Sequence, residues 1–344
     1  MRGEKLLRIA ALTGGKNVPS ARFRVRQLIP ALRDYGVLMH EFIPTISLYP
    51  PARKWLRPFW GGGALAVRVP AVLATHCYDA VFLQRELIST FLTLEPLTKR
   101  PRVLDVDDAI SLYREGRFAE RLARRCDLII CGNDYLGNIF SRWNKNAKVI
   151  PTAVDTRRYV PKKATGAEHL DVIGWTGTSA NFKYLYEIET ALATVLKTCP
   201  DVILRIIADD KPAFRSIQER RIDFIPWSPE NEVKGIQGMS IGIMPLSDSA
   251  WTRGKCSFKM LQYMACGVPV VVSPVGMNAQ VLSLGAVGLG ASNQNEWIAA
   301  LVGLLGDEKE RVNMGANGRN IVTTHFSIDV IAPQLAANLR NLSV

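Results

Sequence analysis

Two successive alternations of short apolar runs and helix-like segments constrain the fold of this 344-residue chain more than any other feature. In the first half, the apolar runs predict strands at 7–13, 80–83, 102–105, 128–131 and 148–150. In the second half, they predict strands at 171–175, 203–208, 222–226, 241–246 and 270–273. Helical spacing between the runs, for example at 22–35 and 118–125, is typical of strand–helix–strand units. The sequence therefore predicts an α/β protein with two doubly wound parallel sheets.

A polar, proline-containing stretch at 152–169 interrupts this alternation and predicts a linker between two domains. We expect an N-terminal domain at 1–151, a C-terminal domain at 170–325 and a final helix within 326–344. A chain of this length suits two domains of roughly 150 residues each.

The charge balance favours anionic partners, because 43 Lys and Arg residues against 31 Asp and Glu residues give a formal net charge of +12. Nucleotide diphosphates and anionic lipid head groups both fit such a field. Nucleic acid would fit it as well, but no nucleic-acid-binding motif is present, and we expect no nucleic-acid partner.

Cysteine usage and hydropathy indicate where the protein works. The six cysteines contain no Cys-x-x-Cys pair, which favours neither a zinc site nor a disulfide framework and fits a reducing cytosol. The apolar part of the N-terminus is too short for a signal peptide, and no apolar run is long enough to span a bilayer. We expect a cytoplasmic protein that can associate peripherally with the inner face of a membrane.

A basic loop before a short helix is the most specific site signal in the chain. Arg253, Lys255 and Lys259 surround a predicted helix start at Ser257 and Phe258. The first amide groups of a helix and its dipole already favour an anion at this position. The loop is therefore a candidate cradle for a diphosphate, although an ordinary strand–helix unit with a solvated basic turn would have the same pattern.

The order of residues in this region resembles a known enzyme family. The run Gln262–Val271, QYMACGVPVV, is similar to the Glu-Ala-Met-Ala-x-Gly-x-Pro-Val-Val run of family 4 of the retaining glycosyltransferases with the GT-B fold. Val149–Asp155, VIPTAVD, resembles the Val-Ile-Pro-Asn-Gly-Val-Asp run that leaves their first domain. Such enzymes usually carry two glutamates separated by seven residues. Here Gly254 and Gln262 stand at those two positions.

The resemblance implies two Rossmann-like domains facing across a cleft, with the C-terminal helix returning to the first domain. It also implies transfer of a sugar from a nucleotide diphosphate sugar to an acceptor hydroxyl, with retention of configuration. The leaving phosphate would help to deprotonate the acceptor. Lys183, Arg253, Lys259 and the amides near Ser257 would stabilise the negative charge of the departing nucleotide. Gln262 would bind the ribose as a neutral hydrogen-bonding partner.

A different class of glycosyltransferase holds a divalent metal on the nucleotide with an Asp-x-Asp motif, which residues 105–107 match, but this motif is in the first half and the phosphate-type features are in the second. We therefore expect neither a metal nor a cofactor.

Further candidates for nucleotide-sugar binding follow the first strand of the second half. Gly177 and Thr178 lie in a glycine turn that allows close approach of the backbone to a phosphate. Asn181 is a suitable helix cap, and Lys183 stands where the family often places a cation against the diphosphate. Trp227 is a candidate contact for the base. A capped turn without a ligand and a core or rim tryptophan remain open as alternatives.

Candidate acceptor residues lie in the first half. Asp107 and Asp108 end a predicted strand, where open α/β sheets place their ligands, and they would orient the acceptor or accept its proton. The alternative is a helix-capping cluster paired with Arg117 or Arg121.

The loop after the first predicted strand supplies a second set of acceptor candidates. It contains Gly14, Gly15, Arg22 and Arg24, and the resemblance places it beside the cleft. A solvated basic turn is an equally good interpretation, because no phosphate-loop pattern is present.

Cations and aromatic residues interleave at 53–60, RKWLRPFW, with Arg68 and Arg85 beyond them. Aromatic rings favour the bilayer interface and cations favour its anionic head groups, which predicts peripheral membrane association. This fits a sugar or lipid-linked acceptor in polysaccharide or glycolipid biosynthesis. An acceptor-side loop and an ordinary surface loop are the alternatives.

Two other functions are compatible with the same sequence. A nucleotide-sugar epimerase of this fold would turn over without any acceptor. A non-catalytic nucleotide-sugar binding protein would bind nucleotide but transfer nothing, and the absence of both family glutamates makes it a reasonable alternative.

Overall fold

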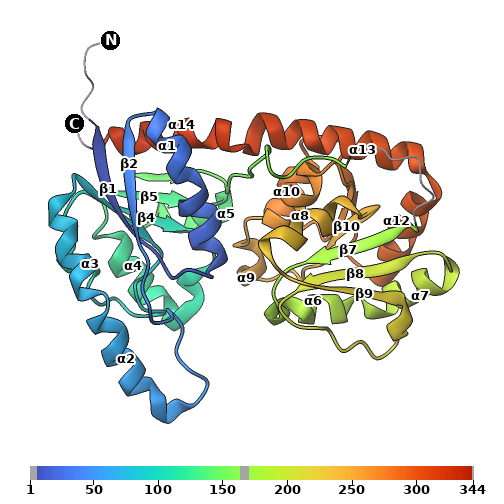
Figure 1. The fold of residues 1–344 in the computed structure, drawn as a ribbon, viewed down its shortest axis with the longest axis horizontal. Helices are drawn as coiled ribbons and strands as arrows, with labels where there is room; N and C mark the ends of the chain where they lie inside the picture. Colours follow the sequence, from blue (N-terminus) through green and yellow to red (C-terminus); the bar gives the residue numbers. More distant parts are fainter. Residues whose placement is uncertain (1–5, 163–169, 343–344) are drawn as a thin grey trace. The chain divides into compact units, whose positions relative to one another are not determined.

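The computed structural model describes residues 6–162 and 170–342. Contacts divide the chain into two units (Figure 1). Unit 1 comprises 1–153, 254–256 and 328–344, and unit 2 comprises 154–253 and 257–327. The short segment 254–256 thus leaves the second half of the chain to pack within unit 1.

Unit 1 is built on a six-stranded parallel sheet with the order β2-β1-β3-β4-β5-β6. The strands are β1 (Leu7–Leu12), β2 (Val37–Phe42), β3 (Ala80–Gln84), β4 (Arg102–Val106), β5 (Leu128–Cys131) and β6 (Ala147–Val149). The central strands β3, β4 and β5 are buried along their whole length, because helices cover both faces of the sheet. Leu12 pairs with Leu83 and Gln84 pairs with Asp105, so the carboxyl ends of β1, β3 and β4 meet at one edge.

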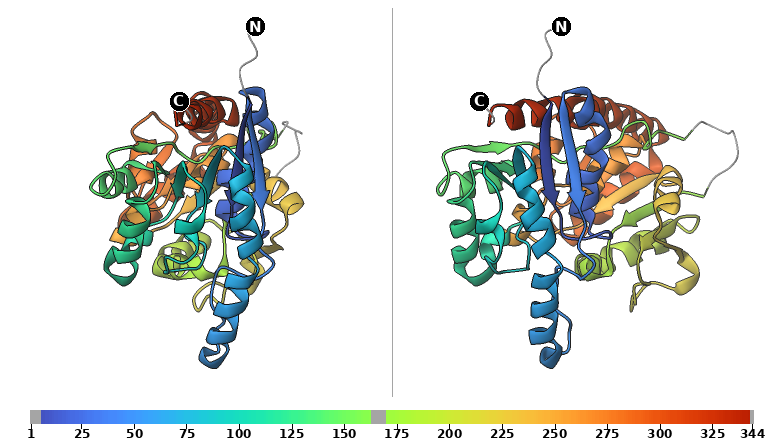
Figure 2. Two further views of the ribbon diagram at one scale, coloured as in Figure 1. Left: turned by 90° about the vertical axis from the view of Figure 1, so that its left-hand side faces the viewer. Right: turned by 60° about the vertical axis from the view of Figure 1, so that its left-hand side comes forward.

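The helices of unit 1 are short, and the C-terminal helix joins them. Its α-helices are α1 (Ile29–Asp34), α2 (Arg57–Ala66), α3 (Val69–Ala74), α4 (Arg117–Ala123), α5 (Asp134–Phe140) and α14 (Ile328–Arg340). Its other helical turns are η1 (Ala21–Val25), η2 (Arg26–Leu28), η3 (Lys54–Leu56), η4 (Thr75–Cys77), η5 (Glu95–Leu97) and η6 (Ile110–Gly116). Helix α14 packs beside α1 and buries Ile331, Leu335 and Leu339 in the core of unit 1 (Figure 1). By contrast, α2 projects away from the rest of unit 1 (Figure 2).

Unit 2 repeats the plan with the order β12-β11-β10-β7-β8-β9, again entirely parallel. Its strands are β7 (Val172–Thr176), β8 (Ile203–Ala208), β9 (Ile222–Pro226), β10 (Ile241–Met244), β11 (Val270–Val272) and β12 (Gly288–Gly290). Its helices are η7 (Ser179–Asn181), α6 (Phe182–Glu187), α7 (Glu189–Thr198), η8 (Glu219–Arg221), α8 (Pro229–Gln237), α9 (Ala250–Arg253), α10 (Phe258–Ala265), α11 (Met277–Leu282), α12 (Gln294–Gly306), α13 (Glu308–Ile321) and η9 (Val322–Phe326). Trp175, Leu192 and Trp297 belong to its main core cluster.

The two parallel sheets confirm the predicted fold class, and three local differences have physical reasons. Strand β2 escaped prediction because it is an edge strand with polar residues inside it, and β12 because it is short and flanked by glycine. The continuous helix expected at 22–35 is wrong: a π turn and a 3₁₀ turn precede α1. Pro30 lacks an amide hydrogen and its ring excludes a regular preceding turn. Within 6–162 and 170–342, no helix has the length and apolar character needed to cross a membrane.

Candidate functional site

In unit 2, the loop after β7 is hydrogen-bonded to the end of β8 and to the loop that follows it. The Gly177 amide donates to the Ile207 carbonyl at 3.0 Å, and the Ser179 amide and hydroxyl donate to Asp209 at 2.6 and 2.9 Å. Asn181 stands at the N-cap position of α6 as expected, but its side chain donates to the Thr178 hydroxyl at 2.9 Å and makes no capping hydrogen bond. These bonds hold Gly177 and Thr178 at the carboxyl edge of the sheet, where parallel α/β sheets bind their ligands.

Lys259 depends directly on that glycine turn. Its Nζ lies 4.7 Å from the centroid of the Trp175 ring, a cation–π contact. A β-carbon at position 177 would lie 2.6 Å from Lys259 Cε and 2.6 Å from the Trp175 ring. Trp175 is buried and cannot move aside. The absence of a side chain at Gly177 therefore lets Lys259 pass over the turn.

Hydrogen bonds that involve polar side chains, and not a helix cap, hold the start of α10. Ser257 has φ 50° and makes no capping hydrogen bond. Its hydroxyl donates to Asn278 Oδ1 at 2.6 Å, and Asn278 Nδ2 donates to the Ser273 carbonyl at 3.0 Å. Phe258, the first helical residue, is half-buried. The turn before α10 is thus held rigidly with no side chain capping the helix.

The other two cations expected in this region are on the surface of unit 2. Arg253 forms a two-bond ion pair with Asp248 at 2.7 and 2.8 Å. Lys183 is exposed, with its Nζ 4.9 Å from the centroid of the neighbouring Tyr184 ring. Because exposed ion pairs are weak, the pairing of Arg253 with Asp248 can be exchanged for a ligand at little cost.

Gln262 is not available to a ligand in the way the sequence suggested. Its side chain is buried, and its Nε2 donates to the Tyr159 hydroxyl at 2.7 Å and to Glu232 Oε1 at 3.2 Å. Tyr159 in turn donates to Glu232 Oε2 at 2.7 Å. The half-exposed Trp227 also donates to Glu232, at 3.2 Å. The ribose contact expected from the Gln262 amide is therefore wrong, since its hydrogens are already used within unit 2.

The position of the other family glutamate is closed by packing. A β-carbon on Gly254 would lie 2.7 Å from Ala109 Cβ and 3.0 Å from the Ala109 amide nitrogen. The Cys256 thiol donates to the Asp107 carbonyl at 3.2 Å, and a β-carbon on Gly132 would lie 2.3 Å from its sulfur. A glutamate cannot occupy position 254 in this structure because the segment lies directly on backbone of unit 1.

Lys255 lies in this same segment, 254–256. Lys255 belongs to unit 1, where Asn133 Nδ2 donates to its carbonyl at 3.0 Å. Its charge lowers the pKa of Asp108. Lys255 therefore belongs to the same unit as the candidate acceptor residue Asp108.

The carboxyl edge of the unit 1 sheet carries a group of titratable residues, which we call the unit 1 charge cluster. It consists of Tyr49, Arg85, Glu86, Asp107, Asp108 and Lys255. Arg85 is only 4% exposed, and its guanidinium lies 3.4 Å from Asp108 Oδ2 and 3.5 Å from Glu86 Oε1. Burial and the adjacent Asp107 raise the pKa of Asp108 to about 6, against the opposing charges of Lys255 and Arg85. The alternative pairing of these aspartates with Arg117 or Arg121 is wrong, because Asp108 pairs with Arg85.

Several polar atoms around this cluster are buried without a partner. Gln84 Nε2, Arg85 Nε, Glu86 Oε2 and Asp107 Oδ1 make no hydrogen bond to any residue that the structure describes. Each such atom is unfavourable by about 1–3 kcal/mol unless something satisfies it. Two are donors and two are acceptors, which is the complement of a ligand rich in hydroxyl groups. The sequence carried a signal for Gln84, Arg85 and Glu86, since three polar residues directly follow a predicted strand.

The loop after β1 is only partly what the sequence suggested. Arg24 is buried and forms a bidentate ion pair with Asp105, whose shorter contact is 2.5 Å, and it also donates to the Ile150 carbonyl at 2.8 Å. The expectation of a ligand-facing or solvated Arg24 is therefore wrong. Gly14 and Gly15 are buried next to the cluster, with the Gly14 amide donating to Gln84 Oε1 at 3.3 Å.

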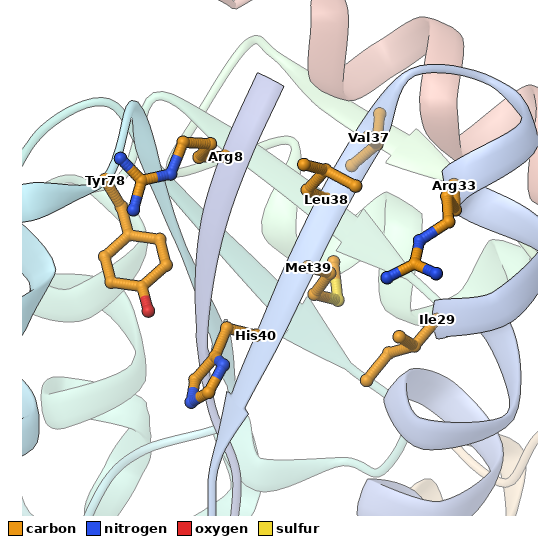
Figure 3. A pocket seen from close by; sticks show the side chains of 8 residues that line it. All are labelled: Arg8, Ile29, Arg33, Val37, Leu38, Met39, His40 and Tyr78. Atoms are coloured by element: carbon orange, nitrogen blue, oxygen red, sulfur yellow. The ribbon is translucent and has the colours of Figure 1, made fainter. Parts of the chain in front are cut away.

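Two further features of unit 1 are the Arg22 side chain and a hollow along strand β2. Arg22 is half-buried, with its guanidinium 4.5 Å from the centroid of the Phe23 ring. A hollow of about 250 Å³ follows the free edge of β2, with Arg33 and Ile29 on one side of the strand and Arg8, His40 and Tyr78 on the other (Figure 3). No residue singled out from the sequence lines it, so it is a separate feature of the sheet edge.

Comparison with known proteins finds a family model that matches part of the chain. Residues 171–307, which carry Gly177, Trp227 and Lys259, match the family model described as glycosyl transferases group 1. No curated protein matches the chain significantly in sequence.

Solved structures match nearly the whole chain. Anabaena HepE in complex with UDP and glucose is 16% identical with a TM-score of 0.72, and the match covers 98% of this chain and 100% of that one. Sucrose-phosphate synthase from Thermosynechococcus elongatus is 17% identical with a TM-score of 0.72, covering 98% and 99%. WaaG, a glycosyltransferase involved in lipopolysaccharide biosynthesis, is 12% identical with a TM-score of 0.67, covering 96% and 99%. These matches confirm the GT-B fold expected from the sequence.

Proposed function

We propose that the protein transfers a sugar from a nucleotide diphosphate sugar to an acceptor hydroxyl, with retention of configuration, and the match of residues 171–307 to the family model described as glycosyl transferases group 1 supports this proposal. The observation that carries this proposal is the Lys259 ammonium, held over Trp175 beside the Gly177 turn within the matched segment. The complexes of HepE with UDP and with UDP-glucose support a nucleotide-sugar donor for a protein of this fold.

In this proposal, unit 2 binds the donor and stabilises its leaving group. Lys259, Arg253 and Lys183 supply positive charge, and the amides at the start of α10 add the favourable end of a helix dipole. Groups fixed before reaction stabilise developing charge without needing to reorganise. Thr178 and Ser257 would contact the phosphates, and the half-exposed Trp227 would contact the base.

Unit 1 binds the acceptor through its charge cluster. The partnerless atoms of Gln84, Arg85, Glu86 and Asp107 would pair with acceptor hydroxyls, which both donate and accept hydrogen bonds. Asp108, with its raised pKa, would orient the reacting hydroxyl as an ionised hydrogen-bond acceptor.

Neither a metal nor a cofactor takes part in the proposed reaction. Protein cations take the place that a divalent ion would have on the diphosphate. The Asp-x-Asp pair of unit 1 is not free to act as a ligand set, because Arg24 holds Asp105 in a buried bidentate ion pair.

We also propose a cytoplasmic protein that docks on an anionic membrane through the tip formed by η3 and α2. Trp55 is 66% exposed and Phe59 is 77% exposed on this projecting element (Figure 2), and Arg53, Lys54 and Arg57 surround them on the surface. Two cations expected to contribute do not: Arg68 and Arg85 are buried, and burial lowers the pKa of Arg68 to about 10. The docking surface is therefore smaller than the sequence suggested. It would suit a lipid-linked acceptor.

The experiment that tests the donor is a thermal-shift screen of UDP, GDP, ADP and TDP. We expect one of them to raise the melting temperature, because a ligand that binds only the folded state stabilises it. The matching nucleotide sugar should then release nucleotide when an acceptor is present. Failure of all four nucleotides to stabilise the protein or to be released would refute the proposal.

A second candidate function is supported by the positions of the two missing glutamates. Gly254 is sterically closed, and Gln262 is bonded internally, so a non-catalytic nucleotide-sugar binding protein would have the same features. Nucleotide binding without transfer to any acceptor would favour that function. Turnover of the nucleotide sugar without an acceptor would favour an epimerase.

A further inference from the structure

A groove of about 460 Å³ in unit 1 lies beside the charge cluster and has a different character. Its walls are the loop after β3 and the segment formed by η6 and the start of α4. The side chains that define its chemistry are Phe91, Arg114, Glu115, Arg117, Phe118 and Arg121. Three guanidinium groups minus one carboxylate leave two net positive charges around the groove.

The guanidinium groups of the groove form few strong contacts with the residues that the structure describes. Arg117 pairs with Glu115 at 2.6 Å, but both side chains are 75% exposed, where an ion pair is weak and exchanges readily. The Arg121 guanidinium has no hydrogen-bond or ion-pair partner in the described part of the chain. Arg114 stacks its guanidinium 4.0 Å from the centroid of the Phe91 ring and reaches from one wall of the groove to the other.

The backbone adopts an unfavourable conformation to place Arg114. Arg114, Glu115 and Gly116 follow one another in the left-handed region with φ of 48°, 58° and 74°, and Thr90 on the opposite wall has φ 65°. Residues with a β-carbon rarely adopt this conformation, and it persists mainly where function requires it. A β-carbon at Gly116 would also lie 2.8 Å from the Ser111 carbonyl oxygen, so the turn is specified by that glycine.

One wall of the groove is hydrogen-bonded to the charge cluster. The Thr90 amide donates to Glu86 Oε1 at 3.3 Å, which joins one wall of the groove to a residue of the cluster. The other wall, η6, begins two residues after Asp108. A ligand that occupied both would place hydroxyl groups at the cluster and an anionic group between the arginines.

We propose that this groove binds a phosphate or diphosphate group of the acceptor, so that the acceptor is a phosphate-bearing sugar. The inference rests on the proposed function, because it assigns the acceptor to unit 1. Arginine is the side chain best suited to such a group, since its planar fork forms paired hydrogen bonds to phosphate oxygens. Phe91, which is 43% exposed, adds apolar surface to one wall, against which a sugar ring or the first part of a lipid carrier can rest.

The test uses inorganic pyrophosphate as the probe, with unit 2 first saturated by the preferred nucleoside diphosphate. Titration calorimetry on the parent should show a second binding event. The double variant Arg114→Gln/Arg121→Gln should weaken it by about ten- to a hundredfold, as expected for lost charge-assisted hydrogen bonds. Arg142→Gln is the matched control, because Arg142 is an exposed arginine of unit 1 outside the groove.

The outcomes separate this inference from the proposed function. Equal pyrophosphate affinity in the parent, the double variant and the control, with nucleotide binding intact, would overturn the groove assignment alone. Absence of nucleotide binding in the parent would instead overturn the proposed function. Glucose 1-phosphate and vesicles of phosphatidylcholine with phosphatidic acid distinguish the source of the phosphate. Weaker binding of glucose 1-phosphate by the double variant than by the parent indicates a soluble acceptor. Weaker binding of the vesicles by the double variant indicates a lipid-linked acceptor.

Discussion

At the scale of single residues, Gly177 and Lys259 act as one unit, because the glycine leaves the space through which the lysine passes. We predict that Lys259→Gln weakens nucleoside diphosphate binding by about ten- to a hundredfold, the effect of losing a charge-assisted hydrogen bond. Gly177→Ala should weaken it about tenfold by displacing Lys259. Titration calorimetry measures both effects. Gly303→Ala is the control, since nothing lies within 4 Å of a β-carbon at that helical position. Equal affinity in Gly177→Ala and Gly303→Ala would contradict this arrangement.

Asp108 determines a second prediction at this scale, the pH dependence. Its pKa of about 6 in the folded protein lies above the usual value of 3.8, so the folded state disfavours the ionised form. Its contribution to stability is therefore greatest below pH 3.8 and declines as pH rises to about 6. The proposed role needs the ionised form, so kcat/KM for the acceptor should rise through pH 6 while stability falls.

A pH profile between about 5 and 8 checks this prediction. Asp108→Asn should lower kcat/KM for the acceptor by about ten- to a hundredfold and remove the acid limb of the profile. Nucleotide affinity should not change, since Asp108 belongs to unit 1. A flat profile in the parent would show that Asp108 does not titrate in the reaction.

At the scale of elements, the tip formed by η3 and α2 is the feature with the clearest physical consequence. Its exposed Trp55 and Phe59 should insert at the bilayer interface, and each cation near an anionic surface adds on the order of 1 kcal/mol. We predict that the protein binds anionic vesicles and that this binding weakens as salt is added. In Trp55→Ala/Phe59→Ala, vesicle binding should weaken further, at high salt as well as at low salt. Leu97→Ala is the control, because Leu97 is 62% exposed elsewhere in unit 1. Co-sedimentation measures the effect, and no binding of the parent at low salt would exclude this mode of docking.

At the scale of the whole molecule, the two units divide the charges needed for transfer. The cations assigned to the diphosphate are in unit 2, and the carboxylates assigned to the acceptor are in unit 1. We predict that EDTA leaves nucleotide binding and transfer nearly unchanged, because side chains and helix amides stabilise the negative charge of the diphosphate in place of a divalent ion. Assays with EDTA, and with EDTA followed by excess Mn²⁺, measure this. Activity lost with EDTA and restored by Mn²⁺ would assign the protein to a metal-dependent mechanism.

The sequence by itself determined the fold class and the loops that carry the candidate site. Strands covered on both faces are apolar along their length, so β5 and β11 were visible as aliphatic and β-branched runs. The residues that follow such runs lie at the carboxyl edge of a parallel sheet, which identified Gly177 and Asp107 without coordinates. These inferences succeed because they depend on neighbours in the sequence.

Only the tertiary structure decided which polar residues are exposed and what they contact. Arg24 has the sequence context of a surface cation, but its partner Asp105 is 81 positions away, and their pairing removes both from the ligand-facing set. Gly254 stands where the family has a glutamate, and only the packing of Ala109 against it explains why no side chain fits there. The charge state and availability of a buried group depend on long-range neighbours, and no local pattern in the sequence encodes them.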